Sequence, residues 1–276
     1  MRLDLLKDES LIILGKVYMN PRFEFSQILR EVADISLTDQ LLDEFAMISD
    51  EKTKLIQDAV RKFADGVPLQ YITGKTEFMG LPIEVNENVL IPRPDTECIV
   101  ERALNLISSE SDVLDLCSGS GCIGIALKKI GKCKTITFSD ISASALEICK
   151  KNCQLNNTDA CFIQGDLFEN INDKYDLIIS NPPYIKTEEI EKLETNVKDH
   201  EPRIALDGGN DGLDFYRRII KDAPKYLKSG GRLIFEIGFD QAEKIRELIN
   251  LSGNFSFEAV YEDYGRNTRG IYAKLK

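Results

Sequence analysis

The chain shows three successive patterns of hydrophobic and polar residues. Up to about residue 66, apolar residues recur at the three- and four-residue spacing of amphipathic helices, and no strand pattern is present. The three stretches with this spacing are 25–32, 41–48 and 55–63. Gly66 and Pro68 then end the last stretch. The pattern predicts a small helical bundle over residues 1–70.

The second pattern, of short β-like runs, occupies residues 71–92. Residues 78–85 and 89–91 each have the composition of a strand, and the polar residues 86–88 between them are typical of a turn. We therefore expect a β-hairpin that links the helical domain to the rest of the chain. Residues 92–97 follow, where prolines and acidic residues favour the first turn of a helix.

From residue 112 onward, apolar strand-like runs alternate with helical patterns. The expected strands are 113–116, 135–139, 161–163, 176–180, 232–237, 256–261 and 271–275. The expected helices are 122–131, 142–156, 212–227 and 239–251. Such alternation predicts a parallel sheet with helices on both faces. The fold class is therefore α/β, with a Rossmann-like, seven-stranded sheet in residues 93–276 behind the helical domain and the hairpin.

Composition and charge narrow the classes of partner. Hydrophobic residues make up 43% and charged residues 29% of the 276 residues, as in ordinary globular proteins. No run reaches the ~18 apolar residues of a membrane span, and the first nine residues carry acids that do not suit a signal peptide. We expect a cytoplasmic protein with no membrane partner. The net charge of −11 argues against nucleic acid as the main partner, because phosphate binding needs a basic field.

Seven cysteines and a single histidine limit the possible chemistry. We expect the cysteines to be reduced and mostly buried. Cys149 and Cys153 lie four apart on an expected helix, but without a paired CxxC and with one histidine the sequence predicts no metal site. The shortage of histidine also disfavours a hydrolase triad. His200 lies between Asp199 and Glu201 in what has the composition of a solvated turn.

The expected strand 176–180 ends in Asn181, Pro182, Pro183 and Tyr184. Neither proline has a backbone N–H, so the strand cannot continue its ladder. What remains is a rigid tip with one side-chain amide, an unpaired carbonyl and an aromatic ring. Such a tip can hold a planar group that carries NH₂, because it offers two acceptors and a ring face. The alternative is a simple strand end with the tyrosine in the core.

A loop rich in glycine and serine follows strand 113–116. Its residues are Cys117, Ser118, Gly119, Ser120 and Gly121. Such a loop lets a ligand approach the backbone closely. Asp115 lies inside the strand before the loop, and Asp140 ends the next strand, where a ribose diol is held in nucleotide-binding sheets; Asp140 could instead cap a helix. Asp166, followed by Leu167, ends the third strand and could accept a hydrogen bond from an adenine amino group.

Because parallel strands end at one edge of a sheet, these three acids and Asn181 should line a single crevice. Asp115 beside the loop does not suit a pyrophosphate, whereas it suits a cationic ligand. S-adenosylmethionine has an adenine, a ribose diol and cationic groups, and it has no phosphate. We therefore expect it to be the cofactor, bound by the loop, the three acids, Leu167 and Asn181.

With these motifs the chain resembles class I S-adenosylmethionine-dependent methyltransferases. Within them it is similar to the protein-(glutamine-N5) methyltransferases that modify peptide chain release factors. The resemblance covers nearly everything after residue 67. It includes the segments 68–74, 90–97, 201–203, 205–209 and 211–213. The tip motif is shared with nucleic-acid methyltransferases, so the Pro-Arg-Pro and Glu-Pro-Arg segments carry the assignment. Cys117 stands where many relatives are expected to have glycine, and Leu167 stands where an aromatic residue is expected to pack on adenine.

The resemblance implies methyl transfer to the amide nitrogen of the glutamine in the Gly-Gly-Gln motif of a class-1 release factor, a step linked to translation termination. The Asn181 side-chain oxygen and the Pro182 carbonyl would accept the two amide hydrogens, with Pro183 and Tyr184 beside the amide plane. The helical domain and the hairpin would recognise the protein substrate, and we expect a monomer.

Three other classes of function remain open from the residues. A DNA or RNA amino-group methyltransferase could use the same tip, but the acidic charge counts against it. An NAD-linked dehydrogenase does not suit Asp115 beside the loop. A binding module on an inactive scaffold would be expected to have lost Asn181 or Asp140, and both are present.

Overall fold

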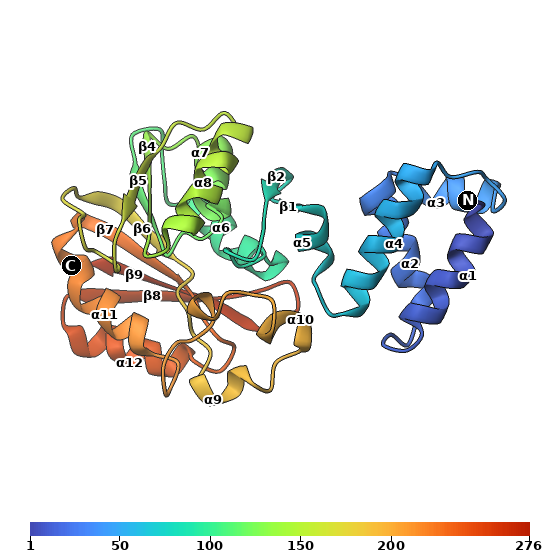
Figure 1. The fold of residues 1–276 in the computed structure, drawn as a ribbon. Helices are drawn as coiled ribbons and strands as arrows, with labels where there is room; N and C mark the ends of the chain where they lie inside the picture. Colours follow the sequence, from blue (N-terminus) through green and yellow to red (C-terminus); the bar gives the residue numbers. More distant parts are fainter. The chain divides into compact units, whose positions relative to one another are not determined.

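The computed structural model describes all 276 residues, which form two compact units. Met1–Gly74 and Glu194–His200 make up the first, which we call the helical unit. Lys75–Leu193 and Glu201–Lys276 make up the second, the sheet unit. Each unit is described by itself (Figure 1).

The helical unit contains six helices. They are α1 (Leu3–Leu14), α2 (Pro21–Ala33), α3 (Leu37–Leu42), α4 (Asp50–Ala64), α5 (Leu69–Thr73) and the short α10 (Thr195–Lys198). Its core consists of apolar side chains from α1, α2 and α4, among them Leu6, Ile28 and Ile56, which have no exposed surface. The helix predicted around 41–48 is wrong in position, because a capping box between Ser36 and Asp39 starts α3 earlier and the helix ends at residue 42.

The sheet unit is built on seven strands in the order β5-β4-β3-β6-β7-β9-β8. They are β3 (Asp112–Leu116), β4 (Thr135–Asp140), β5 (Cys161–Gln164), β6 (Tyr175–Ser180), β7 (Leu227–Glu236), β8 (Phe255–Glu262) and β9 (Thr268–Leu275). All seven predicted strands are confirmed. The predicted parallel sheet is confirmed from β5 to β7, whereas β9 pairs antiparallel with both of its neighbours, which the alternating pattern did not indicate. A short turn at residues 263–267 joins β8 to β9, and a connection of that length permits only an antiparallel pair.

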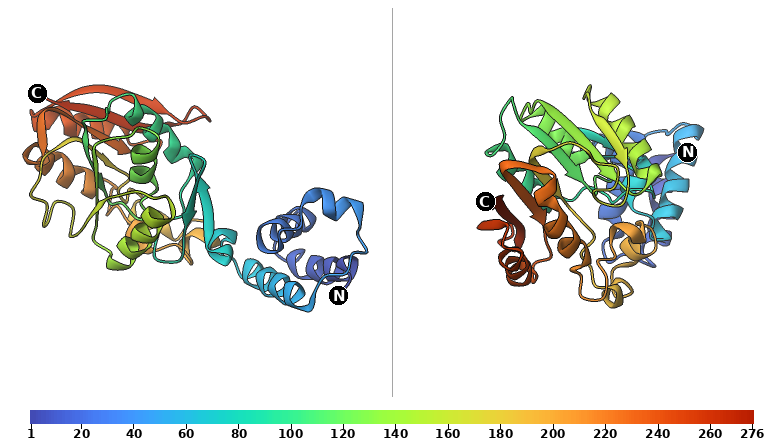
Figure 2. Two further views of the ribbon diagram at one scale, coloured as in Figure 1. Left: turned by 90° about the horizontal axis from the view of Figure 1, so that it is seen from above. Right: turned by 90° about the vertical axis from the view of Figure 1, so that its left-hand side faces the viewer.

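Helices cover both faces of this sheet (Figures 1 and 2). They are α6 (Glu97–Leu104), α7 (Cys122–Lys129) and α8 (Ala143–Leu155) on one face, and α11 (Asp214–Asp222) and α12 (Ala242–Ser252) on the other. Short helical pieces complete the unit: η1 (Pro94–Thr96), α9 (Thr187–Ile190), η2 (Arg203–Ala205) and η3 (Ala223–Lys225). Phe235 packs in the core formed with α11 and α12. Because side chains alternate along a strand, Glu236 faces the opposite side, where α6 packs against β7 and β9.

The predicted hairpin is present, but its strands lie elsewhere. They are β1 (Lys75–Phe78) and β2 (Leu81–Glu84), which pair antiparallel. Met79 and Gly80 form the turn with φ values of 52° and 74°, the left-handed conformation of a tight two-residue hairpin turn. The strand predicted at 89–91 is therefore wrong. The polar residues 86–88 do form a turn, closed by a hydrogen bond of 3.1 Å from the Val89 N–H to the Asn86 carbonyl, but this turn follows β2 and is not the hairpin turn. The hairpin is held to α8, because Asn152 exchanges hydrogen bonds of 2.6 and 2.9 Å with the backbone of Glu84.

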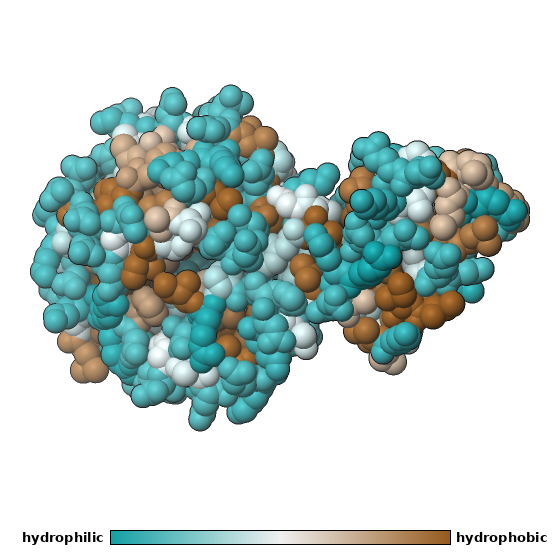
Figure 3. Space-filling model, in the orientation of Figure 1, coloured by the Kyte–Doolittle hydropathy of each residue, from teal (hydrophilic) through white to brown (hydrophobic).

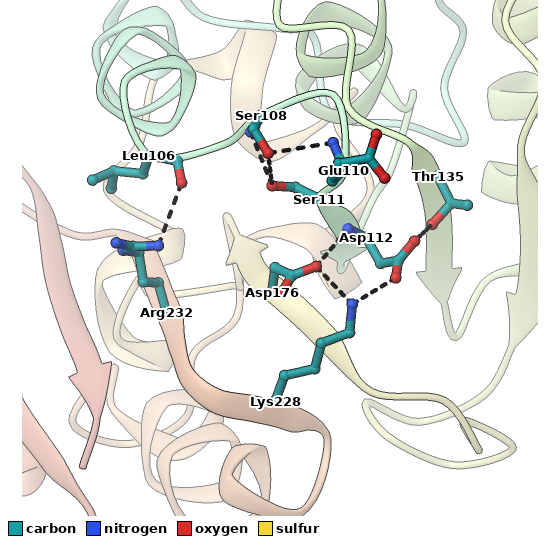
Figure 4. Close-up of polar contacts among 9 residues, drawn as sticks. All are labelled: Leu106, Ser108, Glu110, Ser111, Asp112, Thr135, Asp176, Lys228 and Arg232. Atoms are coloured by element: carbon teal, nitrogen blue, oxygen red, sulfur yellow. Dashed lines mark hydrogen bonds and ion pairs between the residues drawn. The ribbon is translucent and has the colours of Figure 1, made fainter.

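A charged cluster ties the amino ends of four neighbouring strands together (Figure 4). The Lys228 ammonium lies 2.6 Å from an Asp112 carboxylate oxygen and 2.7 Å from an Asp176 oxygen. The Thr135 hydroxyl donates to Asp112 at 2.7 Å, and the Asp112 backbone N–H donates to Asp176 at 2.8 Å. The cluster joins β4, β3, β6 and β7 at the edge opposite to their carboxyl ends, which remain open for a ligand.

Hydrophilic residues dominate the face of the molecule in Figure 3, with hydrophobic patches between them. The helical unit exposes many of the large apolar side chains: Leu5, Ile12, Val17, Met19, Phe23, Leu37, Leu41, Leu42, Phe45, Met47 and Leu55. None of the helices combines the length and the apolar character that crossing a bilayer would require.

Candidate active site

A cleft of about 200 Å³ opens at the carboxyl edge of the parallel strands in the sheet unit. Most of the predicted site residues lie in its walls: Cys117, Ser118, Gly119, Ser120, Asp140, Asp166, Leu167, Asn181 and Pro183. The other predicted residues lie behind the walls: Asp115, Gly121, Pro182 and Tyr184. The structure therefore brings the ends of β3, β4, β5 and β6 around one cavity, as parallel topology requires.

The glycine loop between β3 and α7 has a backbone conformation that residues with a side chain rarely adopt. Gly119 and Gly121 have φ values of 51° and 80°, in the left-handed region. A Cβ atom on Gly121 would lie 2.4 Å from the Cys149 sulfur, so no larger residue fits there. Cys117 also has a positive φ, of 60°, which is a strained conformation for a residue with a side chain.

Asp140 holds the loop with both of its oxygens. One oxygen accepts from the Gly119 backbone N–H at 2.8 Å, and the other accepts from the Ser142 N–H at 2.9 Å. The Ser142 side chain, rather than Asp140, caps α8 by accepting from Ala145 N–H. Burial raises the pKa of Asp140, while the backbone hydrogen bonds lower it. Since each carboxylate oxygen can accept more than one hydrogen bond, the group can still receive donors from a ligand in the cleft.

Asp115 is fully buried beneath the loop and does not line the cleft. One carboxyl oxygen accepts from the Gly124 N–H at 2.8 Å, and the other is buried without any hydrogen-bond partner. Burial raises the pKa of Asp115 well above its ordinary value, and the nearby Asp140 raises it further. A nearby cationic group would stabilise the ionised form of Asp115 and so counteract both the burial and the repulsion from Asp140. The unpartnered oxygen is therefore consistent with a positively charged ligand nearby.

Asp166 forms an ion pair that the sequence did not predict. An Asp166 oxygen lies 2.7 Å from the Arg218 guanidinium of α11, and both side chains are about half exposed. Arg218 and Phe215 line the cleft beside Leu167, which has a φ of 56°. Only one oxygen of Asp166 is taken by this pair, so its other oxygen can face a ligand.

Two glycines pack closely against the backbone of the tip that follows β6. A Cβ atom on Gly208 would lie 2.7 Å from the Tyr184 Cα, and one on Gly212 would lie 2.4 Å from the Tyr184 carbonyl oxygen. The Gln241 side chain donates to that carbonyl at 2.9 Å. The Asn181 side chain lines the cleft and makes no hydrogen bond within the protein. The backbone of the tip is thus fixed while its amide group stays available.

Arg93 and Glu201 connect two segments that carry the family resemblance. They form an ion pair, and Arg93 lines the cleft. The Glu201 side chain is only 1% exposed, so the prediction of a solvated turn is wrong at this residue. Burial raises the pKa of Glu201, and the Arg93 charge lowers it.

Sequence reasoning missed several cleft residues. Ile141 follows Asp140 directly and Arg93 lies in a recognised motif, so both had a signal in the sequence. Phe215 and Arg218 come from α11, which is far from the loop in sequence, and no local pattern connects them to it. No group of three or more histidine, cysteine or acidic side chains is arranged to hold a metal ion.

Comparisons with known proteins identify the family of the chain. The sequence model of the Methyltransferase small domain matches residues 96–198, and that of the PrmC N-terminal domain matches residues 13–74. A release factor glutamine methyltransferase of Clostridium acetobutylicum is 41% identical over 84% of this chain and 86% of its own length. Its counterpart in Thermodesulfovibrio yellowstonii is 39% identical over 96% of both chains. Another, in Fusobacterium nucleatum, is 40% identical over 92% of this chain and 73% of its own.

Solved structures agree on the fold. A methyltransferase from Pyrococcus furiosus covers 71% of this chain and 90% of its own, with a TM-score of 0.55 and 19% identity. A methyltransferase complexed with SAH covers 73% of this chain and 56% of its own, with a TM-score of 0.54 and 13% identity. At such low identity these likenesses show the fold alone. The relatives near 40% identity show the family, and the chain therefore belongs to the release factor glutamine methyltransferases, S-adenosylmethionine-dependent enzymes.

Proposed function

We propose that this chain transfers a methyl group from S-adenosylmethionine to the side-chain amide nitrogen, N5, of a glutamine in the Gly-Gly-Gln motif of a class-1 peptide chain release factor. The observation that carries the proposal is the Asn181 amide, which stands in the wall of the cleft, free of internal hydrogen bonds, on a rigid tip. The same cleft contains the acidic residues that suit the cofactor.

The residues of the cleft fit S-adenosylmethionine. Asp140 can accept hydrogen bonds from a ribose diol, and the unpartnered oxygen of Asp115 can balance a cationic group. Ile141 and Leu167 offer apolar surface for adenine. The two arginines of the cleft, Arg93 and Arg218, are already ion-paired with Glu201 and Asp166. The cleft therefore has no unpaired cationic side chain to bind a phosphate. This donor set favours a phosphate-free ligand over a dinucleotide.

The main task of the protein residues is alignment. An amide nitrogen is a weak nucleophile because its lone pair is delocalised into the carbonyl. When bound, S-adenosylmethionine supplies an electrophilic methyl group: the nitrogen–carbon bond forms as the carbon–sulfur bond breaks, leaving a neutral thioether. We propose that the Asn181 side-chain oxygen and the Pro182 carbonyl accept the two amide hydrogens, which orients the lone pair and stabilises the positive charge on nitrogen. The extra proton then leaves to water.

The helical unit suits a protein substrate. Its exposed apolar side chains form the kind of surface that marks protein interfaces. The net charge of −11 offers nucleic acid no general attraction. We propose that this unit binds the release factor, that the enzyme acts as a monomer, and that the reaction takes place in the cytoplasm, where translation terminates.

A methyl-transfer assay tests this function. Labelled S-adenosylmethionine is supplied with unmodified release factor, duplex DNA or total RNA, and the labelled peptide is mapped by mass spectrometry. Label on the Gly-Gly-Gln glutamine supports the proposal, whereas label in nucleic acid alone overturns it. Asn181→Ala should remove most of kcat and leave cofactor affinity nearly unchanged; full activity in this variant would contradict the proposed amide contact.

A further inference from the structure

A buried carboxyl group lies beside the amide-binding tip. Glu236 is the last residue of β7, and its preceding residue, Phe235, is paired with Ser180 of β6. One residue further along, β7 ends with Glu236 and β6 is followed by Asn181, so both residues lie at the carboxyl edge of the sheet. Glu236 is only 2% exposed. A second acid therefore lies at this edge besides those in the cleft walls, and the chemistry described so far does not use it.

The Glu236 carboxyl is connected to the tip by Tyr184. The Tyr184 hydroxyl donates to one carboxyl oxygen at 3.4 Å, a long contact of the kind that often tightens in a catalytic complex. Thr96, a residue that lines the cleft, lies close enough to this carboxyl to lower its pKa. The other oxygen is buried without a hydrogen-bond partner. Such a group is costly to bury, which favours a functional reason for it.

The charges around Glu236 leave it poorly neutralised. The Arg269 charge lowers the pKa of Glu236, but its guanidinium is ion-paired with Asp95 at 3.0 Å and with Asp263 at 3.1 Å. The other titratable groups that interact with Glu236 are the Cys98 thiol of α6, the Cys122 thiol of α7 and the Tyr216 phenol of α11, which donates to the Glu236 backbone carbonyl at 2.8 Å. Burial raises the pKa of Glu236 to about 7, while Thr96 and Arg269 lower it and Asp95 raises it.

The neighbouring phenol keeps its proton. Burial and the negative charge of Glu236 both raise the pKa of Tyr184, whose ring packs against the core of the sheet unit. Tyr184 is therefore the donor and Glu236 the acceptor in their hydrogen bond. Ionisation of Glu236 strengthens this bond, because charged acceptors bind donors more strongly.

We propose that Glu236 is a positioning residue for methyl transfer. Its carboxylate fixes the orientation of the Tyr184 ring within the tip. It also places a negative charge behind the site where the substrate nitrogen becomes positive. The proposal rests on the proposed function, since the nitrogen it acts on is the glutamine amide held by Asn181. The active form of the enzyme is the one with Glu236 ionised, so kcat rises with pH through about 7.

Glu236→Gln separates charge from shape, because its amide oxygen can still accept from Tyr184. We expect kcat on the release factor to fall about tenfold at pH 8.5, corresponding to about 1.4 kcal/mol, and the rise near pH 7 to disappear, with KM for S-adenosylmethionine unchanged. Tyr184→Phe removes the hydrogen bond and keeps the charge, so it should lower kcat and retain the pH-dependent rise. His200→Asn, which removes the single histidine, is the control and should keep the wild-type profile.

The outcomes distinguish the two proposals. A wild-type enzyme without activity on the release factor overturns the proposed function and this inference with it. An active wild-type enzyme together with a Glu236→Gln variant of equal kcat at every pH overturns the inference alone. So does a variant whose kcat is lowered by one factor at all pH values while the rise near pH 7 remains, because that result shows a purely structural role. Circular dichroism confirms that each variant is folded, and Glu236→Asp, which keeps the charge, should restore the pH-dependent rise.

Discussion

The tip that carries Asn181 depends on close contact with a glycine from a distant loop, and this contact can be tested by adding one methyl group. In Gly208→Ala the new Cβ would lie 2.7 Å from the Tyr184 Cα and 2.9 Å from the Pro183 carbonyl oxygen. Ordinary contacts begin near 3.4 Å, so the two backbones must separate by about 0.7 Å, since close-packed interiors have no free space to absorb a methyl group. Gly208 does not have a positive φ, so the effect is steric and not a backbone preference.

A displacement of this size should be visible in kcat. Misplacing a reacting group by 1 Å can cost about 100-fold in rate, so we expect Gly208→Ala to lose about 10- to 100-fold in kcat. The cofactor side of the cleft is not displaced, and the Kd for S-adenosylmethionine measured by calorimetry should stay within about twofold of wild type. Overpacking should also reduce the free energy of unfolding by about 1–3 kcal/mol.

The matched control is Gly253→Ala at the C-terminal cap of α12. Gly253 has a φ of 70°, and a Cβ atom there would meet nothing within 4 Å. It should lose about 1 kcal/mol of stability through backbone strain and keep the wild-type kcat. A folded Gly208→Ala variant with wild-type kcat would refute the steric argument, and an equal loss in both variants would show that kcat follows global stability.

Three further changes test other parts of the sheet unit. Asp140→Ala should weaken S-adenosylmethionine binding by about 10- to 100-fold, since hydrogen bonds to a charged group contribute about 1.5–3 kcal/mol; unchanged affinity in calorimetry would exclude it as a cofactor ligand. Cys117→Gly should raise the free energy of unfolding by about 1 kcal/mol, because it relieves a left-handed backbone, and a lower melting temperature would contradict this. Lys228→Met should cost about 1 kcal/mol at pH 7. Lys228 lowers the pKa of Asp112 below 3.8. This contribution is therefore fully present above 3.8 and is lost as pH falls through the lowered value. A difference in urea unfolding that does not shrink as pH is lowered below 3.8 would contradict the argument.

The sheet and the glycine loop were predictable because their signals are local. A buried parallel strand appears as a mostly apolar run, and residues 113–116 and 176–180 are such runs apart from Asp115 and the polar ends of the second segment. The errors arose where two local signals competed. Met79 and Gly80 make the hairpin turn, while the polar residues 86–88, which the sequence favoured for it, form a separate turn after β2. The direction of β9 followed from the length of the turn before it, which the alternating pattern does not show.

The order of strands and helices along the chain, the family motifs, and the residues that end each strand at the ligand-binding edge can all be predicted from the linear sequence. Which of the acids among these residues face the cleft depends on how the elements pack in three dimensions. Asp115 and Glu236 each interrupt an apolar strand in the same way as a ligand-binding acid would, yet neither lines the cavity. Their roles depend on their hydrogen-bond partners: the Gly124 N–H, nine residues from Asp115, and the Tyr184 hydroxyl, 52 residues from Glu236. Side-chain direction, burial and hydrogen-bond partners arise from packing between elements, and a linear pattern of residues contains no information about which distant groups will meet.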